Sequence, residues 1–194
     1  GITAADKVYD GLTTATVSTA AINNASLVVG GLISGDSLTV ASAIGTFADK
    51  NVGNAKSVQL TATYSGNDLN NYAINNLLPI SANITKKDVA LTAITADNKT
   101  YNALTAANIS AGTITGMVGA ETLLVNGSGT FSDANAATGK TVTVADVTLL
   151  NKVNGTGNWS NYNLTTTGAK TTTANITQKD VTLTAVTADN KTYN

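Results

Sequence analysis

The 194-residue sequence contains no histidine, no cysteine and no arginine, and each absence removes a class of chemistry. Without histidine and cysteine the chain has no imidazole base, no thiolate nucleophile, no disulfide and none of the usual zinc ligands. Without arginine it has no bidentate fork for phosphate. No serine or threonine has a base partner, so we expect no enzymatic activity, no catalytic residues and no cofactor.

Charge and long apolar runs are also scarce. Eleven lysines against twelve acidic residues, of which only Glu121 is a glutamate, leave a formal net charge of -1, which excludes a basic surface for nucleic acid. Carboxylates occur at most in pairs, such as Asp6 with Asp10, so we expect no metal site. The longest apolar runs, such as Ser26–Ile33, fall far short of the roughly 20 residues of a membrane-spanning helix.

Threonine, alanine, asparagine, valine, leucine and glycine dominate the sequence, a composition typical of strands and turns. Apolar residues alternate with polar ones, as at Leu38 and Val40 and again at Val142 and Val144, and this indicates half-buried strands. Turn signals recur between them, namely Asp10-Gly11, Gly35-Asp36, Gly66-Asn67-Asp68 and Asn154-Gly155. We predict an all-β fold of two tandem immunoglobulin-like antiparallel β-sandwich domains, each with six to eight strands.

The sequence repeats itself at a spacing of 92 residues. Residues 84–102 agree with residues 176–194 at sixteen of nineteen positions, and residues 2–13 align with 94–105, which places Tyr9 on Tyr101. Residues 45–58 (GTFADKNVGNAKSV) match 129–142, and residues 70–74 (NNYAI) match 160–164. Because a period near 92 is too long for a solenoid repeat, each copy is expected to be a domain.

Apolar parity locates the boundary between the copies. Ala82 and Ile84 lie on one parity, Val89 and Leu91 on the other, and Ile94 returns to the first, so the chain is expected to leave one sheet near residues 86–88. We therefore expect residues 1–86 to form the first domain without its first strand, residues 87–178 the second domain, and residues 179–194 the first strand of a third repeat.

Alternative boundaries at residues 1–92 and 93–194 follow if the last segment instead completes the second domain. In the first case the segment is a free strand, and we expect it to pair with the first domain of a neighbouring molecule in a head-to-tail assembly. The hydrogen-bond partners of Val181 and Leu183 distinguish the two cases.

Several motif residues have structural interpretations. In Tyr9-Asp10-Gly11 we expect Gly11 to supply a positive-φ turn, Asp10 to bond the local backbone and Tyr9 to pack at the sandwich edge. In residues 45–53 we expect a hairpin turn at Asp49 whose glycine and asparagine supply the tight geometry. The structural set is Lys7, Tyr9, Asp10, Gly11, Phe47, Asp49, Gly53, Tyr72, Tyr101 and Phe131, with both phenylalanines in the core.

Trp159 is the residue that most invites a binding hypothesis. It lies near Tyr162 in NGTGNWSNY, and an exposed aromatic ring is the usual platform for stacking a sugar. The competing interpretation is that the ring covers the end of the sandwich. Trp159 and Tyr162 are therefore the candidate ligand-binding residues.

The recurrence of KVYDGLTTA, GTFADKNVG and NNYAI in tandem resembles the YDG-type repeat of very large bacterial surface adhesins of the filamentous-haemagglutinin-like, two-partner-secreted kind. The second copy departs from the motif, with TYNA at residues 100–103. This resemblance implies a secreted or cell-surface location and a stalk or spacer role in adhesion or biofilm formation. The implied partners are adjacent repeats of the same long protein, and host or matrix glycans or proteins for the alternative of a binding module.

Overall fold

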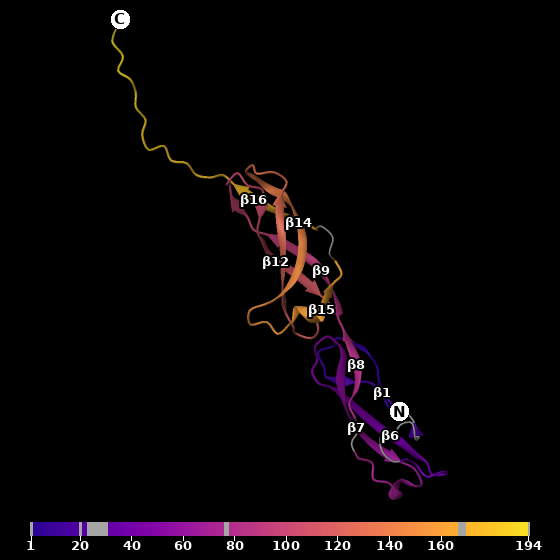
Figure 1. Cartoon of the computed structure of the whole chain (residues 1–194). Coiled ribbons are helices and arrows are strands. Elements are labelled where there is room, and N and C mark those ends of the chain that lie inside the picture. The colour runs from indigo at the N-terminus through magenta and orange to yellow at the C-terminus, as the bar shows by residue number, and fades with distance from the viewer. Residues whose placement is uncertain (1, 20, 23–30, 76–77, 167–169, 194) are drawn as a thin grey trace. The chain divides into compact units, whose positions relative to one another are not determined.

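The computed structural model describes residues 2–19, 21–22, 31–75, 78–166 and 170–193. Strands dominate these residues, and the only helices among them are two three-residue 3-10 helices, η2 (Leu69–Asn71) and η3 (Trp159–Asn161) (Figure 1). The predicted all-β fold of two repeats is confirmed. Gly1 and Asn194, the outer limits of the expected domains, lie outside the described residues.

The first repeat contains one large sheet and one small one. The large sheet has the order β2-β8-β7-β6-β3, with β5 paired to β6, and the small sheet pairs β1 with β4. The strands are β1 (Thr3–Ala4), β2 (Lys7–Val8), β3 (Thr14–Ala15), β4 (Val17–Ser18), β5 (Ala21–Ile22), β6 (Leu38–Phe47), β7 (Gly53–Ser65) and β8 (Ile80–Thr85).

The second repeat reproduces the large sheet in the same order, β10-β16-β14-β13-β11, beside a three-stranded sheet, β12-β9-β15. Its strands are β9 (Lys87–Ala96), β10 (Lys99–Thr100), β11 (Ala106–Ala107), β12 (Ile109–Thr115), β13 (Leu123–Phe131), β14 (Ala137–Asn151), β15 (Tyr162–Leu164) and β16 (Lys170–Thr177). The described residues thus give eight strands per copy, within the predicted range.

The long strands pair in antiparallel fashion as predicted, but three short edge pairings are parallel. They join β2 to β8, β10 to β16 and β15 to β9. Parallel neighbours need a long crossover connection, and in each case a large part of the repeat separates the paired strands in sequence. A two- or three-residue strand at the end of a crossover carries too little alternation to be predicted.

The packing divides into two compact units that do not follow the repeat boundaries. The first comprises residues 1–90, 114–123 and 150–166, and the second comprises residues 91–113, 124–149 and 167–194. Phe47 is buried in the first unit and Phe131 in the second, each 2 % exposed, as predicted. Aliphatic side chains make up most of each core, including Leu38, Val58 and Ile84 in the first unit and Val142, Val144 and Ile176 in the second.

The parity change at residues 86–88 is confirmed. Ala82 and Ile84 face the core from β8, and Val89 and Leu91 then face the core from β9 on the opposite parity. Lys86 is the single residue between the two strands, and β8 and β9 belong to different sheets. The chain therefore changes sheet here, because a shift of one residue moves the apolar set to the other face.

Residues 178–193 follow β16 without forming a strand (Figure 1). Val181 is 90 % exposed and Leu183 is 80 % exposed, whereas their counterparts Val89 and Leu91 in β9 are buried. Neither residue pairs with a described strand of residues 93–175. The pairing of this segment with a neighbouring molecule stays a prediction.

Candidate functional site

The Tyr9 turn, residues Tyr9, Asp10 and Gly11, has the predicted local structure. Gly11 has a φ of 78°, and the Leu12 amide donates to Asp10 Oδ1 at 2.9 Å. Lys7 anchors the turn, since its Nζ donates to Asp10 Oδ1 at 2.7 Å and to two backbone carbonyl oxygens. A positive φ suits glycine because it has no Cβ. The turn holds the Tyr9 ring in a fixed direction.

Tyr9 points into a cluster that sequence reasoning missed. Its hydroxyl donates to Glu121 Oε1 at 2.7 Å, and the hydroxyl of Tyr162 donates to Glu121 Oε2 at 2.6 Å. The two rings meet edge to face with centroids 5.5 Å apart, a favourable arrangement for aromatic pairs. Tyr9 is 1 % and Tyr162 is 2 % exposed. All these residues lie in the first compact unit.

Lys50 completes this tyrosine–glutamate cluster, which we define as Tyr9, Lys50, Glu121 and Tyr162. Lys50 Nζ lies 3.3 Å from Glu121 Oε1. The Glu121 side chain is 9 % exposed, so the carboxylate is mostly removed from water and depends on its hydrogen-bond donors. Tyr162 is positioned in turn by the Val118 amide, which donates to its hydroxyl at 3.1 Å.

A pair of asparagines lies beside the cluster. Asn161 is fully buried, its Oδ1 accepts from the Val52 amide at 2.9 Å, and its Nδ2 donates to Asn51 Oδ1 at 3.0 Å. Asn51 and Val52 come from the first repeat and Asn161 from the second. Because no buried side-chain nitrogen or oxygen among the described residues lacks a partner, these polar groups are fully satisfied.

The electrostatics hold Glu121 ionised and both tyrosines neutral. Burial opposes ionisation of Glu121, but the hydrogen bonds from Tyr162, Tyr9 and Lys50 outweigh it and lower its pKa. Burial and the adjacent carboxylate raise the pKa of Tyr9 and that of Tyr162. The hydrogen bond to Glu121 raises the pKa of Lys50. Because the polar groups of the cluster bond to one another, the cluster is suited to a structural role, as a joint between the segments that contribute its residues.

The Asp49 turn has the predicted hairpin role, with one correction. The Asn51 amide donates to Asp49 Oδ1, and Lys56 Nζ lies 2.7 Å from Asp49 Oδ2. Gly53 was expected to supply tight geometry, but the positive φ, 48°, occurs at Ala55. The Ala55 amide donates to Asn83 Oδ1, and this bond stabilises a bulge near the start of β7, where Gly53 needs no special conformation.

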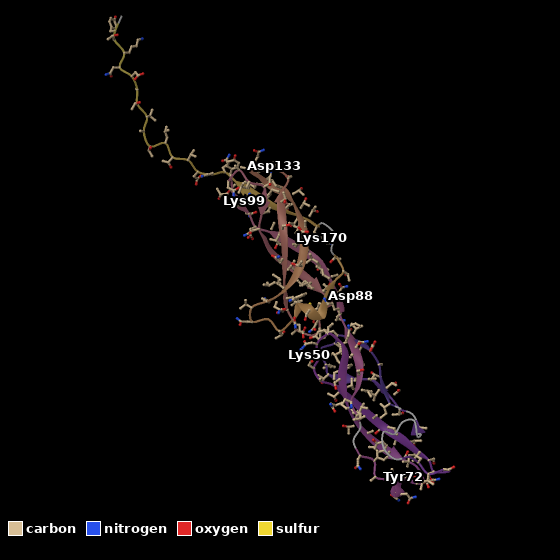
Figure 2. All side chains as sticks on the ribbon, viewed as in Figure 1. Lys50, Tyr72, Asp88, Lys99, Asp133 and Lys170 are labelled. Carbon is tan, nitrogen blue, oxygen red and sulfur yellow. The ribbon has the colours of Figure 1, made fainter. Side chains whose placement is uncertain are left out.

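The second repeat has the same ion-paired hairpin. Lys140 Nζ lies 2.6 Å from Asp133 Oδ1, and the Asn135 amide donates to Asp133 Oδ1. Lys140 is only 8 % exposed. In Figure 2, Asp133 and Lys99 lie at the same end of the second unit.

The candidate ligand-binding residues differ in access. Trp159 is 48 % exposed, and Lys86 Nζ lies 5.7 Å from its ring centroid. Tyr162 is buried and its hydroxyl is committed to Glu121, so it offers no surface to a ligand. Trp159 is therefore the remaining candidate for stacking a sugar.

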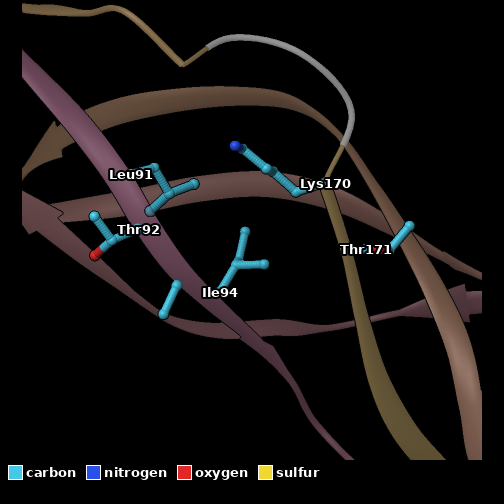
Figure 3. A pocket seen from close by; sticks show the side chains of 6 residues that line it. Leu91, Thr92, Ile94, Lys170 and Thr171 are labelled. Atoms are coloured by element: carbon cyan, nitrogen blue, oxygen red, sulfur yellow. The ribbon is translucent and has the colours of Figure 1, made fainter.

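A shallow pocket of about 200 Å³ lies in the second unit (Figure 3). Its only titratable lining side chain is that of Lys170, and the other lining residues are Leu91, Thr92, Ala93, Ile94 and Thr171. Without a carboxylate or an aromatic ring in the lining, the pocket contains neither an acid–base pair nor a stacking platform.

Two further findings concern the described part of the chain. No group of three or more histidine, cysteine, aspartate or glutamate residues there is arranged to hold a metal ion. In that same part of the chain, no helix has the length and apolar character needed to cross a membrane.

Sequence reasoning predicted the Tyr9 turn but missed Lys50 and Glu121 of the cluster, and it missed the buried Asn161 beside them. Glu121 is 112 residues from Tyr9, and no local pattern joins them. Glu121 is the only glutamate in the chain, which singles it out, but the sequence does not indicate which residues it contacts. Only the tertiary structure brings the two motif tyrosines to one carboxylate.

Comparison with known families assigns the chain to one family. The family model described as YDG domain matches residues 1–79 and 85–174, which are most of the chain in two copies. No curated protein and no solved structure shows significant similarity to the chain. Tyr9 and Lys50 lie in the first matched segment, and Glu121 and Tyr162 lie in the second. The chain therefore belongs to the YDG domain family, as two tandem copies of that domain.

Proposed function

We propose that this chain is a structural spacer in a secreted bacterial cell-surface adhesin and that it projects an adhesive region for adhesion or biofilm formation. The observation that carries the proposal is the tyrosine–glutamate cluster, where residues of both YDG segments meet inside one compact unit. A spacer needs joints that keep successive domains from folding back. A buried carboxylate with three donors supplies such a joint, since breaking it leaves several polar groups unpaired.

The sequence composition supports a mechanical role over a catalytic one. The chain lacks histidine and cysteine, and its threonine- and asparagine-rich strands carry few titratable groups. The proposed partners are therefore adjacent repeats of a long adhesin, and the chain is proposed to act without a cofactor or an enzymatic step. The absence of cysteine also suits a chain that must cross an outer membrane unfolded, because disulfides would hinder it.

Small-angle X-ray scattering tests the spacer role directly. Strands of eight to ten residues at about 3.3 Å per residue, with end loops, give an expected particle length of roughly 70 to 80 Å for two domains. Glu121→Ala breaks the joint and is expected to broaden the distance distribution. Asp146→Ala is the matched control, since Asp146 is an acidic residue of β14 outside the cluster. A compact wild-type particle contradicts the proposal.

Trp159 supports a second candidate, a glycan- or matrix-binding module. Its ring is half exposed, unlike the buried rings of Tyr9 and Tyr162. A glycan array with wild type and Trp159→Ala tests it: specific binding that the variant loses favours the module. No binding on the array leaves the spacer as the function of this segment.

A further inference from the structure

The first and the last strand of each large sheet, in chain order, are neighbours and run parallel. In the first repeat β2 pairs with β8, with Lys7 opposite Ile84. In the second repeat β10 pairs with β16, with Lys99 opposite Ile176. We call β2 with β8 the first entry–exit pair and β10 with β16 the second, because the chain enters each large sheet at one strand and leaves it after the other.

Side-chain and backbone hydrogen bonds extend the first entry–exit pair at both ends. At one end, Asp6 Oδ1 accepts from the Asn83 amide at 2.7 Å, and Asp6 Oδ2 accepts from Asn83 Nδ2 at 2.9 Å. At the other end, the Tyr9 amide donates to the Thr85 carbonyl at 2.9 Å. The segment from Asp6 to Tyr9 is therefore joined along its whole length to the segment from Asn83 to Thr85.

The second entry–exit pair has the same arrangement with one difference. The Tyr101 amide donates to the Thr177 carbonyl at 2.8 Å, and Asn98 Oδ1 accepts from the Asn175 amide at 2.7 Å. Asn98 stands where the first repeat has Asp6, and an amide side chain has one acceptor oxygen where a carboxylate has two. Among the described residues, the second bond to Asp6 therefore has no counterpart in the second pair.

A lysine fixes the first strand of each pair to the turn that follows it. Lys7 bonds the Tyr9 turn as described above, and Lys99 Nζ donates to two backbone carbonyl oxygens of the next turn. We call that turn, residues Tyr101, Asn102 and Ala103, the Tyr101 turn. The Leu104 amide donates to Asn102 Oδ1 at 3.1 Å, and Ala103 has a φ of 62°. Side chains thus hold β2 and β10, although each strand has only two residues.

We propose that the two entry–exit pairs are mechanical clamps, which allow each repeat to carry tension when the chain is pulled from both sides. The pull reaches β2 at its amino-terminal end and β8 at its carboxyl-terminal end. Because these strands are parallel, the two pulls act in opposite directions along the pair. All the hydrogen bonds between them are then loaded together, in shear. The same geometry holds for β10 and β16.

Carrying tension goes beyond the spacer role, which concerns length, and it depends only on hydrogen bonds inside each repeat. Each pair also lies within one compact unit, the first in residues 1–90 and the second in residues 91–113 and 167–194. A failure of the scattering test of particle length therefore leaves the clamps standing, and a failure of the force test leaves the spacer role standing.

Single-molecule force spectroscopy of the full chain, held by handle domains at its two ends, measures the resistance of each clamp. Lys7 and Thr85 are 78 residues apart, and so are Lys99 and Thr177. Opening either clamp is therefore expected to release roughly 260–280 Å of extended chain. Two unfolding events of this length are expected for each molecule.

Asp6→Ala removes both hydrogen bonds at one end of the first clamp. It is expected to make one of the two events about tenfold faster at a given force, because bonds to a charged acceptor are lost. Asp68→Ala is the matched control, since Asp68 also accepts from a backbone amide, that of Ser37 at 3.0 Å, but lies outside the clamp. A much smaller change is expected for it, and equal acceleration by the two variants overturns the proposal.

Asn98→Asp gives the second clamp the residue of the first. The new carboxylate offers a second acceptor oxygen to Asn175 Nδ2, so forced unfolding of the second repeat is expected to slow several-fold. Circular dichroism of each variant confirms that the sheets are intact. An Asn98→Asp chain that is folded but resists force no longer than the wild type contradicts the proposal.

The direction of pulling distinguishes a clamp from ordinary stability, because the free energy of unfolding does not depend on where a force is applied. The chain has no cysteine, so Leu78→Cys, at an exposed position before β8, provides a unique attachment point. Pulling between this thiol and the amino-terminal handle loads β2 and β8 from the same end, and their bonds then break one after another. The first repeat is expected to unfold at a clearly lower force in this direction than end to end, and equal forces in the two directions refute the clamp.

Discussion

The Tyr9 and Tyr101 turns have the same local structure and different surroundings. In both, a lysine bonds the turn from two residues upstream and lies over a phenylalanine ring, at 5.5 Å for Lys7 on Phe47 and 5.2 Å for Lys99 on Phe131. Tyr9 is 1 % exposed, and Tyr101 is 39 % exposed. The motif therefore sets the conformation of the turn, whereas the burial of Tyr9 depends on Glu121 and Tyr162 of the second repeat.

Removing each tyrosine tests this difference with the largest expected effect. Tyr9→Ala is expected to lower the free energy of unfolding by about 3–5 kcal/mol, because it removes a buried ring and one of the three donors to Glu121. Tyr101→Ala is expected to cost less than about 1 kcal/mol, since the ring is exposed. Chemical denaturation measures both, and equal losses would contradict the assignment of Tyr9 to the joint.

Removing the charge of Glu121 is expected to cost about 1–3 kcal/mol, since hydrogen bonds to a charged acceptor are lost. Glu121→Gln tests this, with Asp36→Asn as the matched control, where a smaller loss is expected because Asp36 accepts from Tyr72 and, among the described residues, from no second tyrosine. The pKa of Glu121 is lower in the folded state than its ordinary value of 4.5. The stabilisation is therefore fully present above pH 4.5 and disappears as the pH falls through the lower, folded-state pKa.

Denaturation of wild type and Glu121→Gln at a series of pH values measures that dependence. The difference between the two proteins is expected to shrink as the pH falls below 4.5, because the wild-type carboxyl then becomes protonated. A difference that is constant down to strongly acidic pH would show that the ionised carboxylate is not what holds the two tyrosines.

Substitutions at the third residue of each turn are expected to change the free energy of unfolding by less, and in opposite directions in the two turns. Gly11→Ala is expected to destabilise by about 1–2 kcal/mol, because the positive φ of 78° disfavours a side chain and the new Cβ would crowd Val118. Ala103→Gly removes a Cβ at a φ of 62° and is expected to be neutral or stabilising by under about 1 kcal/mol. Thermal denaturation of the pair tests whether both turns keep the left-handed conformation.

Alkaline titration of the wild type distinguishes the buried tyrosines from the exposed ones. Burial raises the pKa of Tyr9 and of Tyr162 above the ordinary value of 10.0. At Tyr72 the bond from the Ile33 amide lowers the pKa, but the bond to Asp36 and burial together raise it by more, so ultraviolet absorbance is expected to show three tyrosines ionising late. Since these groups ionise more readily in the unfolded chain, stability is expected to fall as the pH rises above 10.0. Tyr9→Phe should remove one late-titrating group. Six tyrosines titrating together would contradict the buried cluster.

Local pattern predicted much of the fold. The alternation of Val142 and Val144 identified a strand, the parity change between Ile84 and Val89 located the sheet switch at Lys86, and Gly11 has the positive φ that its motif required. These succeed because strand periodicity and turn conformation depend on residues adjacent in sequence. The short parallel edge pairings, such as Lys7 on Ile84, lie beyond such patterns because they join distant residues.

By itself the sequence determined two YDG copies, an all-β fold, the two phenylalanine cores and the conformation of the Tyr9 turn. Only the tertiary structure decided that Tyr9 is buried against Glu121 and that Tyr162 is part of the same cluster. The physical reason is that turn geometry is encoded within a few residues, whereas burial and hydrogen-bond partners depend on which distant segments pack together.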